Sequence, residues 1–377
     1  MAGIDIPHFT VDQARVQHVI EQLYQIKQDT PKELRSKDFV LEDEQVWTSW
    51  TMRESVYKKK QDTFPTMSRG LFTKQLPDGQ YQIMVRGYDK FFNVLETKAT
   101  QWPSIMEDTQ GPYEVMAKEN GCIIFIAALS DERVIVTSKH SIPAEKTDTK
   151  AHAGVGYNWV LKHLASVQLT EKDLAAWLYD KNITLVAELC DDEFEQHILP
   201  YVDKDRGLYL HGINYNTSEL YTLPVSIVEQ TAKEFGFHAT DFTVFDTADQ
   251  VKEFGHAMQQ TGIYNGREVE GAVVRCKRHG MDFMFKIKNE QYLMYREYRE
   301  FTNAMLEVKE GFVSIHEVKK EWKCKYEKTR FYIEWLRKRV EDHPEWFLEF
   351  KANKGIIHVR QEFENYWDSG CLGGRLV

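Results

Sequence analysis

The pattern of apolar and polar residues divides the chain into a helical start, a strand-rich middle and a helical end. Apolar residues recur at helical spacing near the start, and they predict that residues 1–60 are largely helical. These residues are Val16, Val19, Ile20, Leu23 and Ile26. The loose, polar run 63–70 is typical of a solvated surface loop that leads into the strands.

Short apolar runs bounded by polar turns predict the strands of the middle region. They cover residues 81–86, 122–129, 133–137, 183–190, 207–214, 269–276 and 283–288. We expect the second and third runs to pair as a hairpin, and the last two runs to form another. Residues 150–180 carry a helical pattern between these strands. The expected fold is therefore α+β, built on antiparallel sheets.

Beyond residue 288 the pattern becomes helical. Five residues of this segment lie on one helical face: Tyr292, Tyr295, Tyr298, Phe301 and Met305. We place a domain boundary near residue 290, which predicts a first domain over 1–289 and a smaller, all-helical domain over 290–377. Residues 317–339 carry nine Lys and Arg against four Glu, and the pattern does not say what this basic segment binds.

Charge and composition narrow the function classes. The chain has 377 residues and a formal net charge of −10, which argues against indiscriminate binding of nucleic acid. A polyanionic partner would have to be held by a local basic cleft. No apolar run approaches the roughly 20 residues that cross a bilayer, and no signal-peptide pattern begins the chain. We expect an intracellular protein of the nucleus or cytoplasm, with no membrane partner.

The strongest candidate for chemistry is Lys118. It lies in Lys118-Glu119-Asn120-Gly121, directly before the apolar run 122–129. A lysine amine has a pKa near ~10.4 in water, and burial beside a strand lowers this value and makes the amine a nucleophile. The same four residues are also typical of a polar turn that merely caps a strand.

Other charged residues lie where an apolar pattern predicts burial. Glu188, Glu270, Lys286 and Lys288 fall within or beside predicted strands. Because an unpaired buried charge costs several kcal/mol, we expect these residues to meet each other or a charged ligand. Arg86 ends a strand beside a glycine and could present its guanidinium to a phosphate. A lattice of structural ion pairs is the alternative.

The order of these segments resembles the nucleotidyltransferase motifs of covalent ATP-dependent RNA and DNA ligases and capping enzymes. Segment 86–93 is similar to the phage RNA-ligase branch of that superfamily. Three further runs resemble the ligase (adenylyltransferase) domain of fungal tRNA ligase: 118–126, 137–141 and 187–192. Most of the superfamily has Asp where this chain has Asn120, a difference that the fungal branch shares.

The resemblance implies an ATP-dependent RNA ligase that seals tRNA exon halves. It implies that Lys118 carries AMP covalently, that AMP passes to the RNA 5′-phosphate, and that a 3′-hydroxyl then displaces it. It implies Mg²⁺ (or Mn²⁺) near Glu270, held directly or through water. The residues it places around ATP are Arg86, Asn120, Gly121, Glu188, Glu270, Lys286 and Lys288.

Fungal tRNA ligases seal ends that carry a 2′-phosphate, and the resemblance implies a site for this dianion. Arg296 and Arg299 lie three apart and would share a helical face. His152 is the candidate third contact. The alternative is that both arginines pair with Glu297, Glu300 or other acids. RNA partners would be tRNA halves and other cleaved RNAs with a 2′-phosphate end.

Two features limit the expected activity to sealing. The chain has no Gly-rich phosphate loop, and its one His-x-Thr lies at 238–240, where a cyclic phosphodiesterase needs two. Kinase and cyclic phosphodiesterase domains are therefore expected elsewhere in a longer protein. Two rival functions stay open: a capping-type guanylyltransferase and a catalytically inactive, RNA-binding pseudo-ligase.

Overall fold

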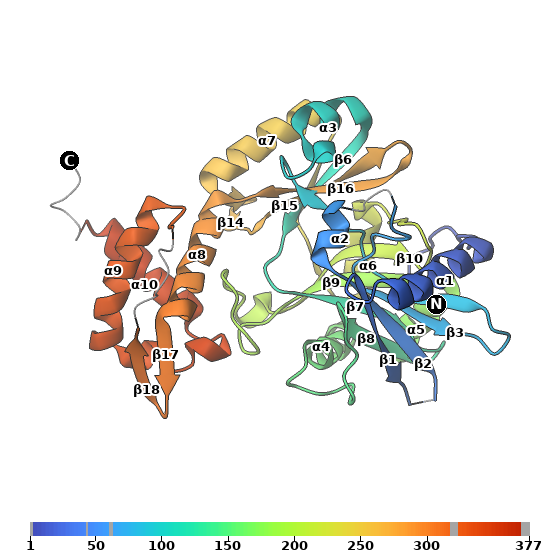
Figure 1. The fold of residues 1–377 in the computed structure, drawn as a ribbon, viewed down its shortest axis with the longest axis horizontal. Helices are drawn as coiled ribbons and strands as arrows, with labels where there is room; N and C mark the ends of the chain where they lie inside the picture. The colour runs from blue at the N-terminus through green and yellow to red at the C-terminus, as the bar shows by residue number, and fades with distance from the viewer. Residues whose placement is uncertain (1–2, 43, 60–62, 317–322, 371–377) are drawn as a thin grey trace. The chain divides into compact units, whose positions relative to one another are not determined.

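The computed structural model describes residues 3–42, 44–59, 63–316 and 323–370 (Figure 1). The chain forms two compact units. The first comprises Met1–Cys190, Gly207–Glu253 and Val273–Ile287, and the second comprises Asp191–Arg206, Phe254–Ala272 and Lys288–Val377. The chain enters the second unit for the last time at Lys288, close to the boundary expected near 290. Two earlier segments, Asp191–Arg206 and Phe254–Ala272, also belong to the second unit. The sequence pattern did not predict that they leave the first unit.

The first unit begins with a helix and a four-stranded antiparallel sheet. Helix α1 (Gln13–Asp29) is capped by Asp12, whose side chain accepts from the backbone N–H of Arg15. The sheet has the order β1-β2-β3-β4. Its strands, with the short helix that follows β2, are β1 (Leu34–Val40), β2 (Val46–Met52), α2 (Glu54–Lys59), β3 (Leu71–Gln75) and β4 (Tyr81–Arg86).

The prediction that residues 1–60 are largely helical is wrong between α1 and α2. Residues 34–52 form the β1–β2 hairpin, and β2 is buried on both faces. Trp50 packs in the core beneath α1, while Trp47 packs in the core shared with the next sheet. Thr48 and Ser49 lie between them and are satisfied by hydrogen bonds to the Asp38 carboxylate and the His140 carbonyl. Polar residues in this strand therefore do not mark a solvent face.

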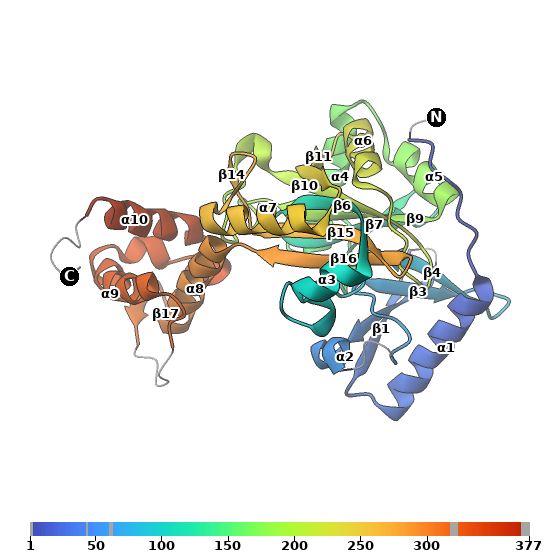
Figure 2. The same cartoon turned by 90° about the horizontal axis from the view of Figure 1, so that it is seen from above.

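A central five-stranded sheet follows, with the order β11-β10-β9-β7-β8. The predicted hairpin of 122–129 with 133–137 is confirmed as the antiparallel pair β7–β8. Helices α4, α5 and α6 pack against this sheet (Figure 2). The elements are β7 (Cys122–Ala128), β8 (Val134–Ser138), α4 (His152–Ser166), α5 (Glu171–Lys181), β9 (Ile183–Cys190), β10 (Gly207–Tyr215), α6 (Val225–Phe235) and β11 (His238–Ala239).

A third sheet of five strands has the order β12-β6-β15-β16-β5. The predicted hairpin near 269–288 is confirmed, because β15 and β16 are neighbours. Strand β6 ends at Lys118 and β7 of the central sheet begins at Cys122, so the lysine turn joins two sheets. The elements are β5 (Phe92–Asn93), η1 (Lys98–Thr100), α3 (Trp102–Asp108), β6 (Thr109–Lys118), β12 (Phe242–Phe245), β15 (Gly271–Arg278) and β16 (Met281–Lys288).

The second unit is helical except for short strands. The predicted apolar face of the first C-terminal helix is confirmed, because all five of its residues are buried in α8. The rings of Tyr298 and Tyr332 stack 4.3 Å apart between α8 and α9. The prediction of an all-helical domain needs correction, since β17 and β18 form a hairpin there. Leu306 and Val308 follow the apolar residues of α8. A short apolar pattern of this kind fits a strand as well as it fits a continued helix.

The remaining elements complete the chain. They are η2 (Asp203–Asp205), α7 (Ala248–Thr261), β13 (Ile263–Tyr264), β14 (Arg267–Glu268), α8 (Glu290–Met305), β17 (Leu306–Lys309), β18 (Phe312–Ile315), α9 (Glu327–Asp342), η3 (Pro344–Phe347), η4 (Phe350–Ala352) and α10 (Ile356–Asp368). Within the described ranges, no helix has the length and apolar character that a membrane span requires. Part of the basic segment 317–339 lies outside the described residues. On α9, exposed Arg330, Arg337 and Lys338 alternate with Glu334 and Glu341.

One buried histidine makes the stability of the first unit depend on pH. His163 Nδ1 lies 2.8 Å from the carbonyl oxygen of Gly236, and Nε2 accepts from the Leu208 N–H at 3.0 Å. One nitrogen must donate and the other must accept, so the folded protein requires the neutral ring. Burial, with His238 nearby, lowers the pKa of His163 to about 4.

We therefore expect His163 to destabilise the fold as it is protonated. Its folded pKa lies below its unfolded value, so its contribution is complete above about pH 6.5 and is lost as pH falls toward 4. In that window the free energy of unfolding should fall by about 1.4 kcal/mol per pH unit through this residue alone. Urea unfolding of wild type and His163→Gln between pH 4 and 8 measures it. Burial beside Lys139 also lowers the pKa of His140 to about 4, but His140 is present in both proteins. Parallel pH profiles would contradict the assignment.

Candidate active site

Lys118 lies in a buried turn rather than a solvated one. Glu119 and Asn120 are only 3% and 5% exposed. A Cβ at Gly121 would lie 2.1 Å from the carbonyl oxygen of Leu189 on β9. Only glycine allows this close approach without displacement of the backbone. The turn is therefore pressed against the central sheet, and this fixes where the lysine amine points.

A cavity of about 290 Å³ opens beside this turn. Its wall is built from both sheets that the turn joins: Met116 and Met284 come from the third sheet, and Ile123 and Glu188 come from the central one. Four cationic side chains reach it: Arg69, Lys118, Lys139 and Lys286. Apolar walls with converging charged groups are typical of a site for a small anionic ligand.

Glu188 fulfils the expectation that a charged residue inside a strand meets a partner. Its Oε1 accepts from the backbone N–H of Gly121 at 3.3 Å. Its Oε2 lies 3.6 Å from Nε2 of His211 on β10. The Glu188 side chain is 12% exposed, and it lines the cavity. One carboxylate thus links the lysine turn, the central sheet and the ligand space.

Lys286 also reaches the cavity, from strand β16. Its Nζ lies 5.6 Å from the centre of the Phe91 ring, and β16 pairs with β5 so that Lys286 is opposite Asn93. Lys288 is the exposed last residue of β16 and projects from the same side of the strand. Lys288 and Glu270 belong to the second unit. The structure therefore brings Lys118, Gly121, Glu188 and Lys286 together in one cavity.

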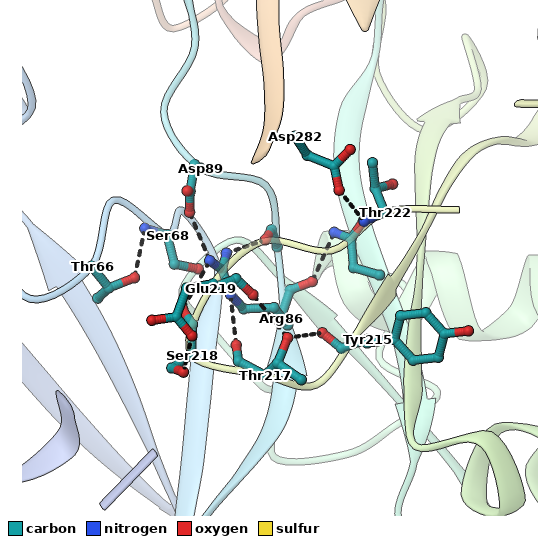
Figure 3. A network of polar contacts seen from close by, with 12 residues as sticks. Thr66, Ser68, Arg86, Asp89, Tyr215, Thr217, Ser218, Glu219, Thr222 and Asp282 are labelled. Atoms are coloured by element: carbon teal, nitrogen blue, oxygen red, sulfur yellow. Dashed lines mark hydrogen bonds and ion pairs between the residues drawn. The ribbon is translucent and has the colours of Figure 1, made fainter. Parts of the chain in front are cut away.

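The buried Arg86 side chain binds other groups of the protein (Figure 3). Its side chain is 1% exposed, and Nη2 forms a 2.7 Å ion pair with Asp89. Nη1 and Nε donate to the backbone oxygens of Gly87 and Thr217 at 2.6 and 3.0 Å, and Nη2 also donates to that of Ser218 at 3.2 Å. Arg86 is not among the residues that line the described cavity. The contact with a phosphate that we expected for Arg86 does not fit this environment, because every part of the guanidinium already binds the protein.

Two cavity cations, Arg69 and Lys139, were missed from the sequence. Arg69 lies in the run 63–70, and the prediction of a solvated loop there is wrong: Ser68 is fully buried, and the Arg69 N–H donates to the Tyr88 carbonyl at 2.8 Å. The Arg69 guanidinium pairs with Glu54 on α2 at 2.8 Å. Lys139 comes directly after the buried strand β8, just as the Lys118 turn comes directly before β7. This position beside a buried strand could have identified Lys139 as a site residue.

The electrostatics of this cluster favour a bound anion. Burial lowers the pKa of Lys139 to about 8, and the positive charge of Arg69 adds to the effect. Glu54 also pairs with Lys90 at 2.9 Å, and these cations, despite its partial burial, hold the pKa of Glu54 below its ordinary value. The Glu54 carboxylate therefore pairs with two cations, Arg69 and Lys90, of which Arg69 lines the cavity.

The three residues expected at a 2′-phosphate lie on two elements. His152 is the first residue of α4 in the first unit, whereas Arg296 and Arg299 lie on α8 in the second. Arg296 pairs with Glu300 at 3.0 Å, as the alternative proposed, and its side chain is 48% exposed. Arg299 is half-buried and lines a small cavity with Tyr295, Tyr298 and Arg360. The two arginines thus have different surroundings.

Comparisons with known proteins show the family of this chain. Residues 67–293, more than half of the chain, match a family described as RNA ligase. The tRNA ligase of Candida albicans is 41% identical over 359 residues, which are 88% of this chain and 42% of that protein. tRNA ligase 1 of Schizosaccharomyces pombe is 41% identical over 312 residues, 80% of this chain and 38% of that protein. The chain spans about two-fifths of the length of these curated relatives.

A solved structure is also similar. An archaeal ATP-dependent RNA ligase (form 2) aligns with a TM-score of 0.49 and 13% identity, over 96% of this chain and 83% of that chain.

The surroundings of Arg86 predict a loss of stability on substitution. Arg86→Lys keeps the charge but cannot supply the forked set of donors, so buried carbonyl oxygens are left without partners. We expect the free energy of unfolding to fall by about 3 kcal/mol or more. Urea denaturation measures it, with Lys286→Ala as a cavity-lining control that should unfold close to wild type. An Arg86→Lys protein as stable as wild type would contradict the structural role.

Proposed function

Because the chain belongs to the RNA ligase family, we propose that it is the sealing part of a fungal tRNA ligase. It joins the 5′-phosphate of one tRNA exon half to the 3′-hydroxyl end of the other, at the expense of ATP. One observation carries the proposal: a buried lysine turn holds Lys118 at a cavity where Arg69, Lys139 and Lys286 also converge. Such an arrangement suits phosphoryl transfer, in which positioned cations supply most of the catalysis.

The proposed reaction has three transfers. Lys118 Nζ attacks the α-phosphorus of ATP, a P–N bond forms, the bond to the β-phosphate oxygen breaks, and pyrophosphate leaves. An oxygen of the RNA 5′-phosphate then attacks the same phosphorus and releases the lysine. Finally the 3′-hydroxyl attacks the RNA 5′-phosphorus, and AMP leaves. Negative charge develops on a phosphoryl group in each step, and the cations of the cavity stabilise it.

The cavity residues suit ATP. At about 290 Å³ the cavity is near the lower end of ligand pockets, which begin at about 300 Å³, and it can receive a nucleoside with its phosphates directed to the open side. Ile123, Val273 and Met284 offer an apolar surface to the base. We propose that Glu188 binds the ribose and that Lys286 and Lys288 meet the phosphates. Asn120 and Gly121 shape the turn beneath them.

We propose Mg²⁺ or Mn²⁺ as the metal, on the family resemblance. These hard cations prefer oxygen ligands, and the cavity carries the carboxylates of Asp89 and Glu119 in addition to the phosphates that ATP would bring. A bound metal would neutralise charge on the phosphoryl oxygens. Glu270 would act on it directly or through water.

The proposed function predicts covalent labelling of Lys118. Protein incubated with α-labelled ATP and Mg²⁺ should acquire one AMP that survives denaturing electrophoresis and is released by acid but not by alkali, as a phosphoramidate would be. Lys118→Ala should remove the label because Lys118 is the proposed nucleophile, and a label that persists would point to another cavity lysine such as Lys139. Lys162→Ala, a surface lysine of α4, is the control and should label normally. Preferred labelling by GTP would support the capping enzyme instead, and absence of labelling in wild type would support the pseudo-ligase.

The second prediction concerns the RNA end. We propose that His152, Arg296 and Arg299 recognise a 2′-phosphate, and that kinase and cyclic phosphodiesterase parts of a longer protein prepare the ends. Alanine at any of the three should reduce sealing of a 2′-phosphate, 3′-hydroxyl end by about tenfold or more while leaving the Lys118 adenylate intact. Exposed Arg337→Ala is the matched control. Equal sealing of 2′-phosphate and plain diol ends by wild type would rule out the recognition site.

A further inference from the structure

A chain of polar side chains leads from the interior of the first unit to Glu188. Arg275 on β15 is 3% exposed, and its Nη2 donates to the Tyr88 hydroxyl at 2.7 Å and to the backbone oxygen of His211. The Tyr88 hydroxyl lies 3.0 Å from Nδ1 of His211. Nε2, on the other side of that ring, faces Glu188 at 3.6 Å. No motif assigned a role to His211.

The backbone is shaped for this contact. The pairing of β10 with β9 shifts register between Leu210 and Gly212, so His211 is the extra residue of a β-bulge. Bulges redirect side chains and are frequent beside active sites. At the next residue, a Cβ on Gly212 would lie 1.9 Å from the Tyr88 hydroxyl oxygen. Glycine at 212 therefore makes room for the hydroxyl that holds the imidazole.

Tyr88 and Arg275 hold both the backbone and the ring of His211. Arg275 donates to the His211 carbonyl and to the Tyr88 oxygen. The Tyr88 hydroxyl lies 2.9 Å from the His211 carbonyl oxygen and 3.0 Å from Nδ1, so it contacts both groups. These contacts keep the ring in an orientation in which Nε2 faces Glu188. Burial of Tyr88 raises the pKa of its hydroxyl, which keeps the hydroxyl protonated.

Glu188 is thus directed from two sides. The Gly121 N–H binds Oε1 and the His211 ring faces Oε2. The His211 and Glu188 side chains are 14% and 12% exposed, and both line the cavity. A carboxylate held in this way at the wall of the cavity can meet a ligand there with a defined orientation. A carboxylate with a fixed orientation can choose between hydroxylated and deoxygenated sugars, because a missing hydroxyl leaves it without a partner.

We infer that His211, fixed by Tyr88 and Arg275, is a positioning residue that orients the Glu188 carboxylate toward the ribose hydroxyls of ATP. The inference rests on the proposed function and deepens it, since it names what sets sugar selectivity in the adenylation step. The imidazole acts through Glu188 and does not contact the reacting phosphorus.

The experiment compares sugars rather than total activity. Lys118 adenylation is measured with ATP, 2′-deoxyATP and 3′-deoxyATP for wild type, His211→Gln and Tyr88→Phe. Wild type should prefer ATP over at least one deoxy analogue. His211→Gln should lower kcat/KM for ATP by about tenfold, the scale of one hydrogen bond to a charged group, and barely change that for the discriminated analogue. Tyr88→Phe keeps the ring but releases Nδ1, and it should cause a smaller loss of the same preference.

The outcomes separate the two claims. No adenylation by wild type would overturn the proposed function, and adenylation without sugar preference would overturn the role of Glu188. Preference in wild type that persists in both folded variants would overturn the positioning role. Equal loss for all three nucleotides would mean that His211 only supports the fold. His256→Gln, at an exposed histidine of α7, is the control. If His211→Gln does not fold, Tyr88→Phe alone decides between these results.

Discussion

The site depends on the close packing of Gly121 against the carbonyl of Leu189. The turn that holds Lys118 joins the last residue of β6 to the first residue of β7, and these strands belong to different sheets. A side chain at position 121 would push this joint away from β9. It would also move the N–H that binds Glu188. One close backbone contact thus positions both the lysine turn and the N–H that binds the Glu188 carboxylate.

Two buried guanidiniums support the same region from behind. Arg86 binds the carbonyls of Thr217 and Ser218, and Arg275 binds those of His211 and Leu223. These carbonyls lie in or after β10, where the backbone leaves the regular ladder and needs other donors. A lysine could not replace either residue, because it lacks the rigid fork that reaches several oxygens at once. The two arginines supply hydrogen-bond donors to these carbonyl oxygens, which in a regular sheet would come from the N–H groups of a neighbouring strand.

A strand or site residue could be predicted from the sequence when the residues next to it in the chain carried the evidence. Glu188 and Lys286 stood out because a charge inside an apolar run has few explanations, and Lys118 stood out because it lies in a turn directly before such a run. The strands on either side were confirmed for the same reason. The β1–β2 hairpin was missed because β2 is buried on both faces, so it lacks the alternation that a one-sided strand shows. Arg69 was missed because its loop is polar, and only the distant Tyr88 carbonyl and Glu54 hold it at the cavity.

The charges explain how an acidic chain can hold a polyanion. The net charge is −10, yet Arg69, Lys118, Lys139 and Lys286 gather at one cavity. Burial lowers the pKa of Lys139, and the repulsion by the nearby positive charge of Arg69 adds to this effect. A triphosphate placed among them would reverse the sign of the interaction and restore the full charge of that lysine. Asp89, Glu119 and Glu188 also line the cavity and balance part of the positive charge. Part of the free energy of nucleotide binding would therefore be relief of the repulsion between the cations that these carboxylates do not balance.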